Sequence, residues 1–194
     1  MSYKQQRSPV LSRDETTLLV GRAQRGDAKA FASLVRGYLR AAYAVALAIV
    51  GRPADAEDIA QEVFIKALEN LHACRQPECF AGWLLQITRH RARNLLDRRR
   101  LRDVPVSGEN VIELMSAPPE AAGMRAALLD GLSALDQRQR EVVLLHDLEG
   151  WTHHEIATAL GISEVLSRQI LWQARQVLRR KLGDTSPLEE NHGG

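Results

Sequence analysis

The sequence has few cysteines, few aromatic residues and no long apolar run, and each absence excludes a class of protein. Two cysteines, Cys74 and Cys79, in 194 residues do not make a disulfide scaffold, and they fit a reducing compartment. Residues 1–13 are polar and lack the apolar core of a signal peptide. The most apolar stretch, 41–50, is about half as long as the roughly 20 residues of a membrane span. We therefore expect a cytoplasmic protein with no membrane insertion.

Runs of alternating β-branched residues are also missing, which predicts an all-α protein. Apolar residues instead recur at spacings of three and four, and 103–122 combines three prolines with Ser, Gly and acids, as linkers do. We predict two small helical domains joined by a flexible linker. Their expected bounds are a disordered lead-in 1–13, a first domain 14–102, the linker 103–122, a second domain 123–183 and a disordered tail 184–194.

The segment 152–182 has the spacing of a helix-turn-helix. Thr152 and Glu155 are spaced as a capping box, and Ala157 is small where a second helix would cross. Gly161 suits a tight turn, and Ser163 can cap the next helix. In this motif the second helix enters the DNA major groove. A plain helical hairpin with a solvated basic face is the alternative.

The second helix of this motif has two expected faces. Leu166, Ile170 and Ala174 are predicted to pack inward. The residues predicted to face DNA are Ser163, Glu164, Ser167, Arg168, Trp172, Arg175 and Arg179.

A basic helix and an acidic helix precede this motif. Seven arginines and one acid lie between 89 and 102, and the arginine fork suits phosphate groups. Phe80 and Trp83, just before them, could stack on single-stranded bases, although the core is the favoured place for Trp83. The preceding helix, predicted over 53–72, carries an acidic face that either binds a protein partner or is solvated. That face contains Asp55, Glu57, Asp58, Gln61 and Glu62.

These segments together resemble the bacterial RNA polymerase sigma-70 family. The run Asp55-x-Glu57-Asp58-Ile59-x-Gln61-Glu62-Val63-Phe64 is similar to the polymerase-binding helix of sigma domain two. The run Phe80-x-x-Trp83-Leu84-x-x-Ile87 and the arginines after it look like the adjoining promoter −10 helix. Residues 135–142 and 149–163 resemble domain four, which reads the −35 element. The presence of domains two and four in this order, with a short linker between them and no domain three, resembles the extracytoplasmic-function (ECF) group.

The resemblance implies an alternative sigma factor, not an enzyme, that directs RNA polymerase to promoters and helps to open the −10 region. The implied partners are core polymerase, through the beta-prime clamp helices and the beta flap, promoter DNA and an anti-sigma factor. The implied polymerase contacts are Asp55, Asp58, Gln61 and Glu62. The implied −10 contacts are His72, Cys74, Arg75, Phe80, Trp83, Arg89, His90, Arg91, Arg93, Asn94 and Arg98. The linker would thread toward the polymerase active-site cleft.

Two features depart from the family pattern. The recognition helix reads Val165-Leu166-Ser167-Arg168-Gln169-Ile170 where the family often reads Gly-Thr-Val-Lys-Ser-Arg, so its inward stripe is expected to be rotated. His90 stands where asparagine is common.

Other functions remain open at this point. A zinc or redox role for His72, Cys74 and Cys79 is conceivable, although Cys-x4-Cys is a weak metal signal and we predict no cofactor. The run His153-His154-Glu155 lacks the spacing of a metal hydrolase, and no phosphate-binding loop occurs. A helix-turn-helix regulator that never docks on core polymerase is the main alternative, but such a regulator does not account for the first domain, 14–102.

Overall fold

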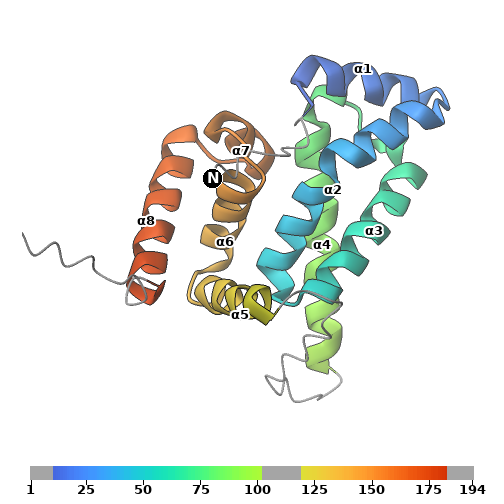
Figure 1. The fold of residues 1–194 in the computed structure, drawn as a ribbon. Helices are drawn as coiled ribbons and strands as arrows, with labels where there is room; N and C mark the ends of the chain where they lie inside the picture. Colours follow the sequence, from blue (N-terminus) through green and yellow to red (C-terminus); the bar gives the residue numbers. More distant parts are fainter. Residues whose placement is uncertain (1–10, 102–118, 183–194) are drawn as a thin grey trace, which may run out of the picture.

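The computed structural model describes residues 11–101 and 119–182, and every regular element in these ranges is a helix (Figure 1). The prediction of an all-α protein is confirmed. The first block contains α1 (Arg13–Gln24), α2 (Ala28–Val50), α3 (Pro53–Glu69), the 3-10 turns Leu71–Ala73 and Pro77–Cys79, and α4 (Phe80–Leu101). The second block contains α5 (Pro119–Ser133), α6 (Gln137–Val143), the π-helical turn Leu144–Leu148, α7 (His153–Leu160) and α8 (Glu164–Leu182).

Side chains at the helix ends account for where several helices begin and stop. Ser12 and Glu15 form a capping box at the start of α1. The carboxylate of Asp27 accepts hydrogen bonds of 3.0 Å from the backbone N–H groups of Lys29 and Ala30 and so caps the start of α2. Gly51, at φ +70°, ends α2 in the left-handed conformation that glycine tolerates best.

The core of the first block is built around α2, which packs against α1, α3 and α4. Residues 41–50 of α2 are buried apart from the half-buried Tyr43, as expected of a core helix. By length and composition α2 could also span a membrane, but 61% of its most apolar window is buried inside the protein. This burial is what a core helix of a soluble domain shows.

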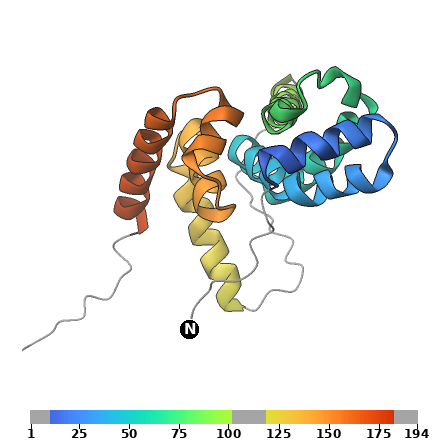
Figure 2. The same ribbon diagram turned by 90° about the horizontal axis from the view of Figure 1, so that it is seen from above.

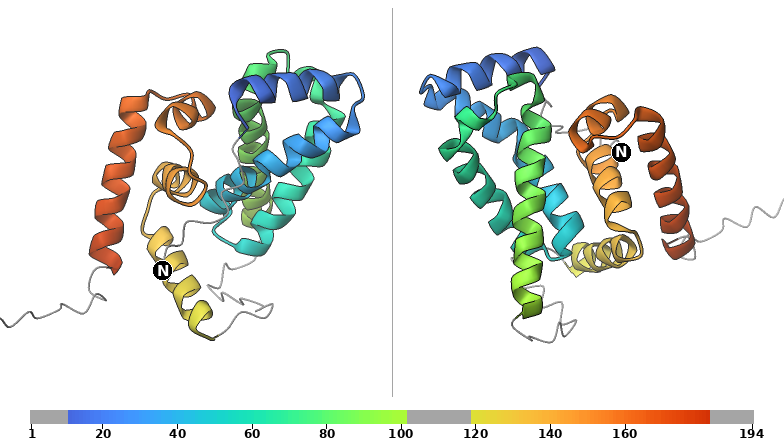
Figure 3. Two further views of the ribbon diagram at one scale, coloured as in Figure 1. Left: turned by 45° about the horizontal axis from the view of Figure 1, so that its top comes forward. Right: turned by 180° about the vertical axis from the view of Figure 1, so that it is seen from behind.

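The second block packs α8 across α5, α6 and α7. Its core contains Leu145, Ile156, Leu171 and Ala174, which are all buried. Helix α8 lies on the side of this block away from α2, α3 and α4 (Figures 1 and 3). Its outer face is therefore left open for a partner.

The two blocks pack directly against each other (Figure 2). Helix α6 lies against α2, and α7 lies against α4. The rings of Tyr38 and Trp151 meet edge to face at 6.3 Å across this interface. A Cβ added at Gly82 of α4 would lie 3.6 Å from the carbonyl oxygens of Thr158 and Ala159, at ordinary van der Waals distance, so α4 and α7 meet closely at this position.

Two ion pairs join the blocks with a carboxylate that is nearly or fully buried. Arg40 lies 2.9 Å from Glu149, whose side chain is 8% exposed, and burial raises the pKa of Glu149. Arg89 lies 3.4 Å from Glu141, whose side chain is 1% exposed. Gln137 also donates to Glu141, at 3.0 Å. The interface therefore combines apolar packing with charges taken out of water.

Some details differ from the sequence predictions. The third helix ends at Glu69 and gives way to a 3-10 turn before His72. Leu68 is 55% exposed, while its neighbours Ala67 and Leu71 are buried. Helix α5 begins at Pro119, inside the range predicted as linker. The predictions for residues 1–10, 102–118 and 183–194 lie outside the described residues.

Candidate nucleic-acid interface

The acidic face of α3 presents three of its four predicted contact residues to solvent. Asp58, Gln61 and Glu62 are exposed, while Asp55 is half-buried. Their common side follows from spacings of three and four in a helix that Pro53 begins. The face is therefore accessible to a protein partner.

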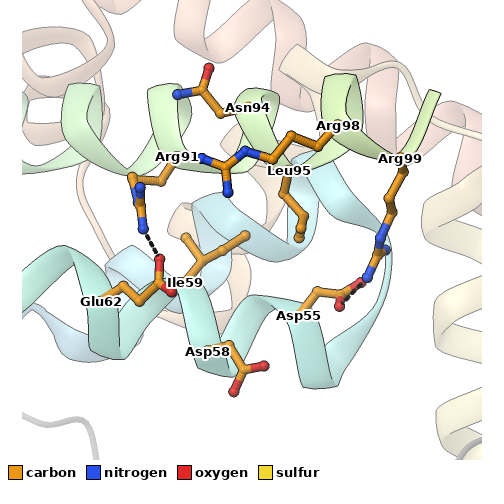
Figure 4. Close-up of a pocket in the computed structure, with 9 residues that line it drawn as sticks. All are labelled: Asp55, Asp58, Ile59, Glu62, Arg91, Asn94, Leu95, Arg98 and Arg99. Carbon is orange, nitrogen blue, oxygen red and sulfur yellow. Dashed lines mark hydrogen bonds and ion pairs between the residues drawn. The ribbon is translucent and has the colours of Figure 1, made fainter. Parts of the chain in front are cut away.

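The basic second half of α4 runs alongside this acidic face, and two ion pairs join the helices (Figure 4). The guanidinium of Arg99 donates to both oxygens of Asp55 at 2.6 Å, and these bonds raise the pKa of Arg99. Arg91 pairs with Glu62 through a single hydrogen bond, from its Nη2 atom to one carboxylate oxygen. A cleft of about 240 Å³ lies between the helices, with Asp58 and Arg98 also on its wall.

The remaining predicted −10 residues of α4 are mostly accessible. His90, Arg93 and Arg98 are exposed and Asn94 is half-buried, so their polar ends can reach a ligand. Arg89 is held against Glu141 in the interface between blocks, and its Nη2 atom is buried without a hydrogen-bond partner.

The aromatic residues at the start of α4 belong to the core in this conformation. Phe80 is fully buried, 5.3 Å from the ring of Tyr38. Trp83 is half-buried against Phe80, at 5.8 Å. The expectation that Phe80 is available for base stacking is thus wrong for this structure. The prediction that Trp83 lies in the core agrees with its packing.

The loop between α3 and α4 presents His72 and Arg75 but buries Cys74. Gln24 of α1 anchors this loop by donating to the carbonyl oxygens of Leu71 and Cys74 at 3.1 and 3.0 Å. Burial, with smaller effects from Cys79 and Glu78, raises the pKa of Cys74 to about 11. Such a thiol stays protonated and is a poor nucleophile or metal ligand. Within the described ranges no group of three His, Cys, Asp or Glu side chains is placed to hold a metal.

The helix-turn-helix forms as its spacing predicts. Thr152 and Glu155 complete the capping box of α7, and Gly161 adopts φ +65° at the turn. The hydroxyl of Ser163 accepts a hydrogen bond of 3.1 Å from the backbone N–H of Leu166. The motif thus sets α8 across α7 with its outer face open to solvent.

The faces of α8 are rotated relative to the prediction. Ser167, expected to face DNA, is fully buried, and its hydroxyl lies 2.9 Å from Nδ1 of His153. Leu166, expected inside, is 41% exposed, and Ile170 is buried as predicted. The bond to His153 is what makes the burial of the Ser167 hydroxyl tolerable.

The other predicted residues of α8 stay accessible. Ser163, Arg168, Trp172, Arg175 and Arg179 are exposed, with Glu164 half-buried. Val165 and Leu166 add exposed apolar surface at the first turn.

Several of the predicted DNA-contacting arginines are already paired within the chain. Arg175 donates to Asp147 at 2.5 and 3.2 Å, and Arg168 lies 3.0 Å from Glu164. Although burial opposes it, hydrogen bonds from Arg175 and His146 hold the pKa of Asp147 below its ordinary value. The ion pairs of Asp147, Glu141 and Glu149 could not be predicted from the sequence, because these acids lie outside any run of charged residues. Only the packed fold brings them close to the arginines.

Comparison with known proteins identifies the two blocks separately. The family model of sigma-70 region 2 matches residues 34–102, and that of sigma-70 region 4 matches residues 125–178. These ranges coincide with the block that carries α3 and α4 and with the helix-turn-helix block.

Individual relatives agree. The chain is 31% identical to "ECF RNA polymerase sigma factor BldN" of Streptomyces coelicolor, over 92% of this chain and 70% of that protein. It is 36% identical to "Probable RNA polymerase sigma factor RfaY" of Xanthomonas campestris pv. campestris, over 82% of this chain but only 42% of that longer protein. The solved structure of CnrH in complex with the cytosolic domain of CnrY is similar with a TM-score of 0.66 and 26% identity, covering 89% of this chain and all of that one. The chain therefore belongs to the sigma-70 family of RNA polymerase sigma factors, in its ECF group.

Proposed function

We propose that this ECF sigma factor divides promoter recognition among three helices. Helix α3 docks on the beta-prime clamp helices of core polymerase through Asp55, Asp58, Gln61 and Glu62. Helix α4 and the loop before it engage the −10 region, and α8 enters the major groove at −35. The observation that carries this proposal is an exposed acidic helix face beside an arginine-rich helix, in one chain with a well-formed helix-turn-helix.

The same proposal covers the activity, location and second polymerase contact of the protein. The protein binds its partners and does not catalyse a reaction, it acts in the cytoplasm, and it contacts the beta flap through the second block. An anti-sigma factor holds it inactive until a signal arrives. The complex of the similar protein CnrH with a cytosolic domain of CnrY supports a proteinaceous partner of this kind.

A regulator that binds DNA without polymerase is the competing function. The match of residues 34–102 to sigma-70 region 2 does not favour it, because such a regulator has no use for this block.

Run-off transcription with purified core polymerase on a pool of genomic promoters tests the proposal. The full chain is expected to form a complex with core and to start transcripts at a defined subset of promoters. If the chain binds duplex DNA but neither binds core polymerase nor directs initiation, the proposed sigma activity is wrong and the regulator is favoured.

The assignment of α3 has its own test. The double change Asp58→Ala and Gln61→Ala should weaken core binding at least about tenfold, because it removes exposed polar contacts from the centre of the face. Neither residue touches the basic helix through an ion pair, so binding of the free chain to duplex DNA should stay within about twofold. A pull-down of core polymerase unaffected by this pair of changes would contradict the assignment.

A further inference from the structure

The two ion pairs between α3 and α4 link residues that the proposed function gives to different partners (Figure 4). Asp55 and Glu62 are polymerase contacts, and each holds an arginine of the promoter-binding helix. While the pairs exist, both oxygens of Asp55, one oxygen of Glu62 and both guanidinium groups are engaged within the chain. The pairing is selective, since Asp58 lies between the two acids along α3 and points away from α4.

We propose that Asp55 and Glu62 act as internal counter-ions that mask Arg99 and Arg91, so that docking of polymerase on α3 releases these arginines for −10 DNA. This inference rests on the proposed function and adds a mechanism of coupling to it. Arg99 binds Asp55 through two parallel hydrogen bonds, the geometry in which guanidinium and carboxylate groups pair most strongly. The side chain of Asp55 is only 14% exposed, so water screens that pair weakly.

The consequence is a thermodynamic linkage between the two binding events. Cationic groups of the polymerase that take over Asp55 and Glu62 leave Arg99 and Arg91 with uncompensated charge on the cleft wall. Phosphate groups of DNA can then neutralise them. Because linkage is reciprocal, DNA bound to these arginines must strengthen polymerase binding by the same factor.

The effect is measurable on the full chain without polymerase. Asp55→Asn with Glu62→Gln should raise the affinity for a labelled duplex roughly tenfold at low salt, because Arg99 and Arg91 become available. Arg52, which lies 3.7 Å from Asp55, is already 56% exposed and is not counted as released. The slope of log affinity against log salt should steepen by about 1.8, the value expected for two additional phosphate contacts. Thermal unfolding checks that the variant remains folded.

A matched variant removes the same charge without releasing an arginine. Glu57 and Asp97 lie exposed on the same two helices, and neither forms an ion pair within residues 11–101 and 119–182. Glu57→Gln with Asp97→Asn should therefore leave the salt slope unchanged and raise affinity only slightly. If both double variants raise DNA affinity and steepen the salt slope equally, the loss of negative charge alone explains the effect and the masking proposal is wrong. If neither variant changes DNA affinity or the salt slope, the masking proposal is also wrong.

The reciprocal measurement separates this inference from the proposed function. Arg91→Gln with Arg99→Gln frees both carboxylates, so its affinity for core polymerase in the absence of DNA should rise several-fold. If Asp55→Asn with Glu62→Gln loses core binding while its affinity for DNA stays that of the unchanged chain, α3 is the polymerase contact but masking is wrong. If the same variant keeps full core affinity, the role of α3 itself fails.

Discussion

At the scale of single residues, the most unusual contact is between His153 and Ser167 inside the helix-turn-helix. Ser167 is fully buried, and its hydroxyl lies 2.9 Å from the ring of His153. A face of the same ring stacks on His146 at 4.7 Å between centroids. A polar pair thus occupies a place where helices normally meet through apolar side chains, on the side of α8 that also buries Ile170, Leu171 and Ala174.

Ser167→Ala removes one partner of this buried pair. The variant should lose about 1 kcal/mol of unfolding free energy, since the imidazole nitrogen keeps its place and loses its hydrogen bond. Urea unfolding followed by circular dichroism measures the loss. Ser163→Ala, at the exposed cap of the same helix, shows how much of any loss comes from capping alone. A Ser167→Ala protein as stable as the unchanged chain would mean that the bond contributes nothing.

The same histidine should make stability depend on pH. Burial, His146, Arg168 and Arg175 lower the pKa of His153, against a smaller opposite effect of Glu164. The folded ring therefore binds a proton less readily than the unfolded one, so stability falls as pH drops through the ordinary histidine value of about 6.5. His153→Gln should lose less stability than the unchanged chain between about pH 7.5 and about pH 5.5. Equal losses in both proteins would contradict this assignment.

At the scale of elements, each helix of the DNA-binding motif has its own start and stop signal. The hydroxyl of Thr152 accepts from the N–H of Glu155 at 3.2 Å, and the carboxylate of Glu155 accepts from the N–H of Thr152 at 2.7 Å. With eight residues, α7 is too short to be stable by helix propensity alone. Capping and packing must therefore hold it in place under α8.

Thr152→Ala should destabilise the second block by about 1 kcal/mol and weaken −35 binding with it, because α7 positions α8. Thr158→Ala is the matched change, since the Thr158 hydroxyl is exposed on the same helix and bonds only the carbonyl oxygen of His154. That variant should lose less than half as much. Chemical denaturation and binding to a −35 duplex measure the two effects, and identical behaviour of both variants would rule out a special role for the cap.

Much of this could be predicted from the sequence, because caps and periodicity are local. The spacing of Thr152, Glu155, Gly161 and Ser163 was sufficient to predict the motif, and the acidic face of α3 is where its spacing placed it. The burial of Ser167 was not predicted, because its partner His153 belongs to another helix.

The same limit applies to the core and to the interface between blocks. The burial of Phe80 and Cys74 and the pairing of Arg89 with Glu141 depend on residues far apart in the chain. Periodicity carries no information about such contacts.

At the scale of the whole molecule, the packing of the two blocks conflicts with their proposed targets. Promoter elements at −10 and −35 are about 25 base pairs apart, which is roughly 85 Å of duplex at 3.4 Å per pair. A compact chain of this length has a radius of gyration of about 16 Å. The contacts of Tyr38 with Trp151 and of Arg89 with Glu141 must therefore break before both elements are bound.

A reversible cross-link tests this separation. Gly82→Cys and Ala159→Cys place thiols at neighbouring positions of α4 and α7, where a Cβ at residue 82 would lie 3.7 Å from Cα of Ala159, in a Cys79→Ser background that removes the half-buried native thiol. The oxidised protein should fail to initiate transcription, and reductant should restore initiation. Gly82→Cys alone should be active under both conditions. Full activity of the oxidised, cross-linked chain would show that the closed arrangement already suits the promoter.

The internal pairing of the arginines also bears on how a scarce protein finds its partner in a cell. Chromosomal DNA offers a vast excess of non-specific sites, and a protein with freely accessible arginines would spend most of its time on them. This chain has a formal net charge of only +2, and Arg89, Arg91, Arg99, Arg168 and Arg175 each contact a carboxylate of their own chain. This pairing should therefore reduce retention on non-specific DNA without abolishing it, since Arg93, Arg98 and Arg179 stay exposed.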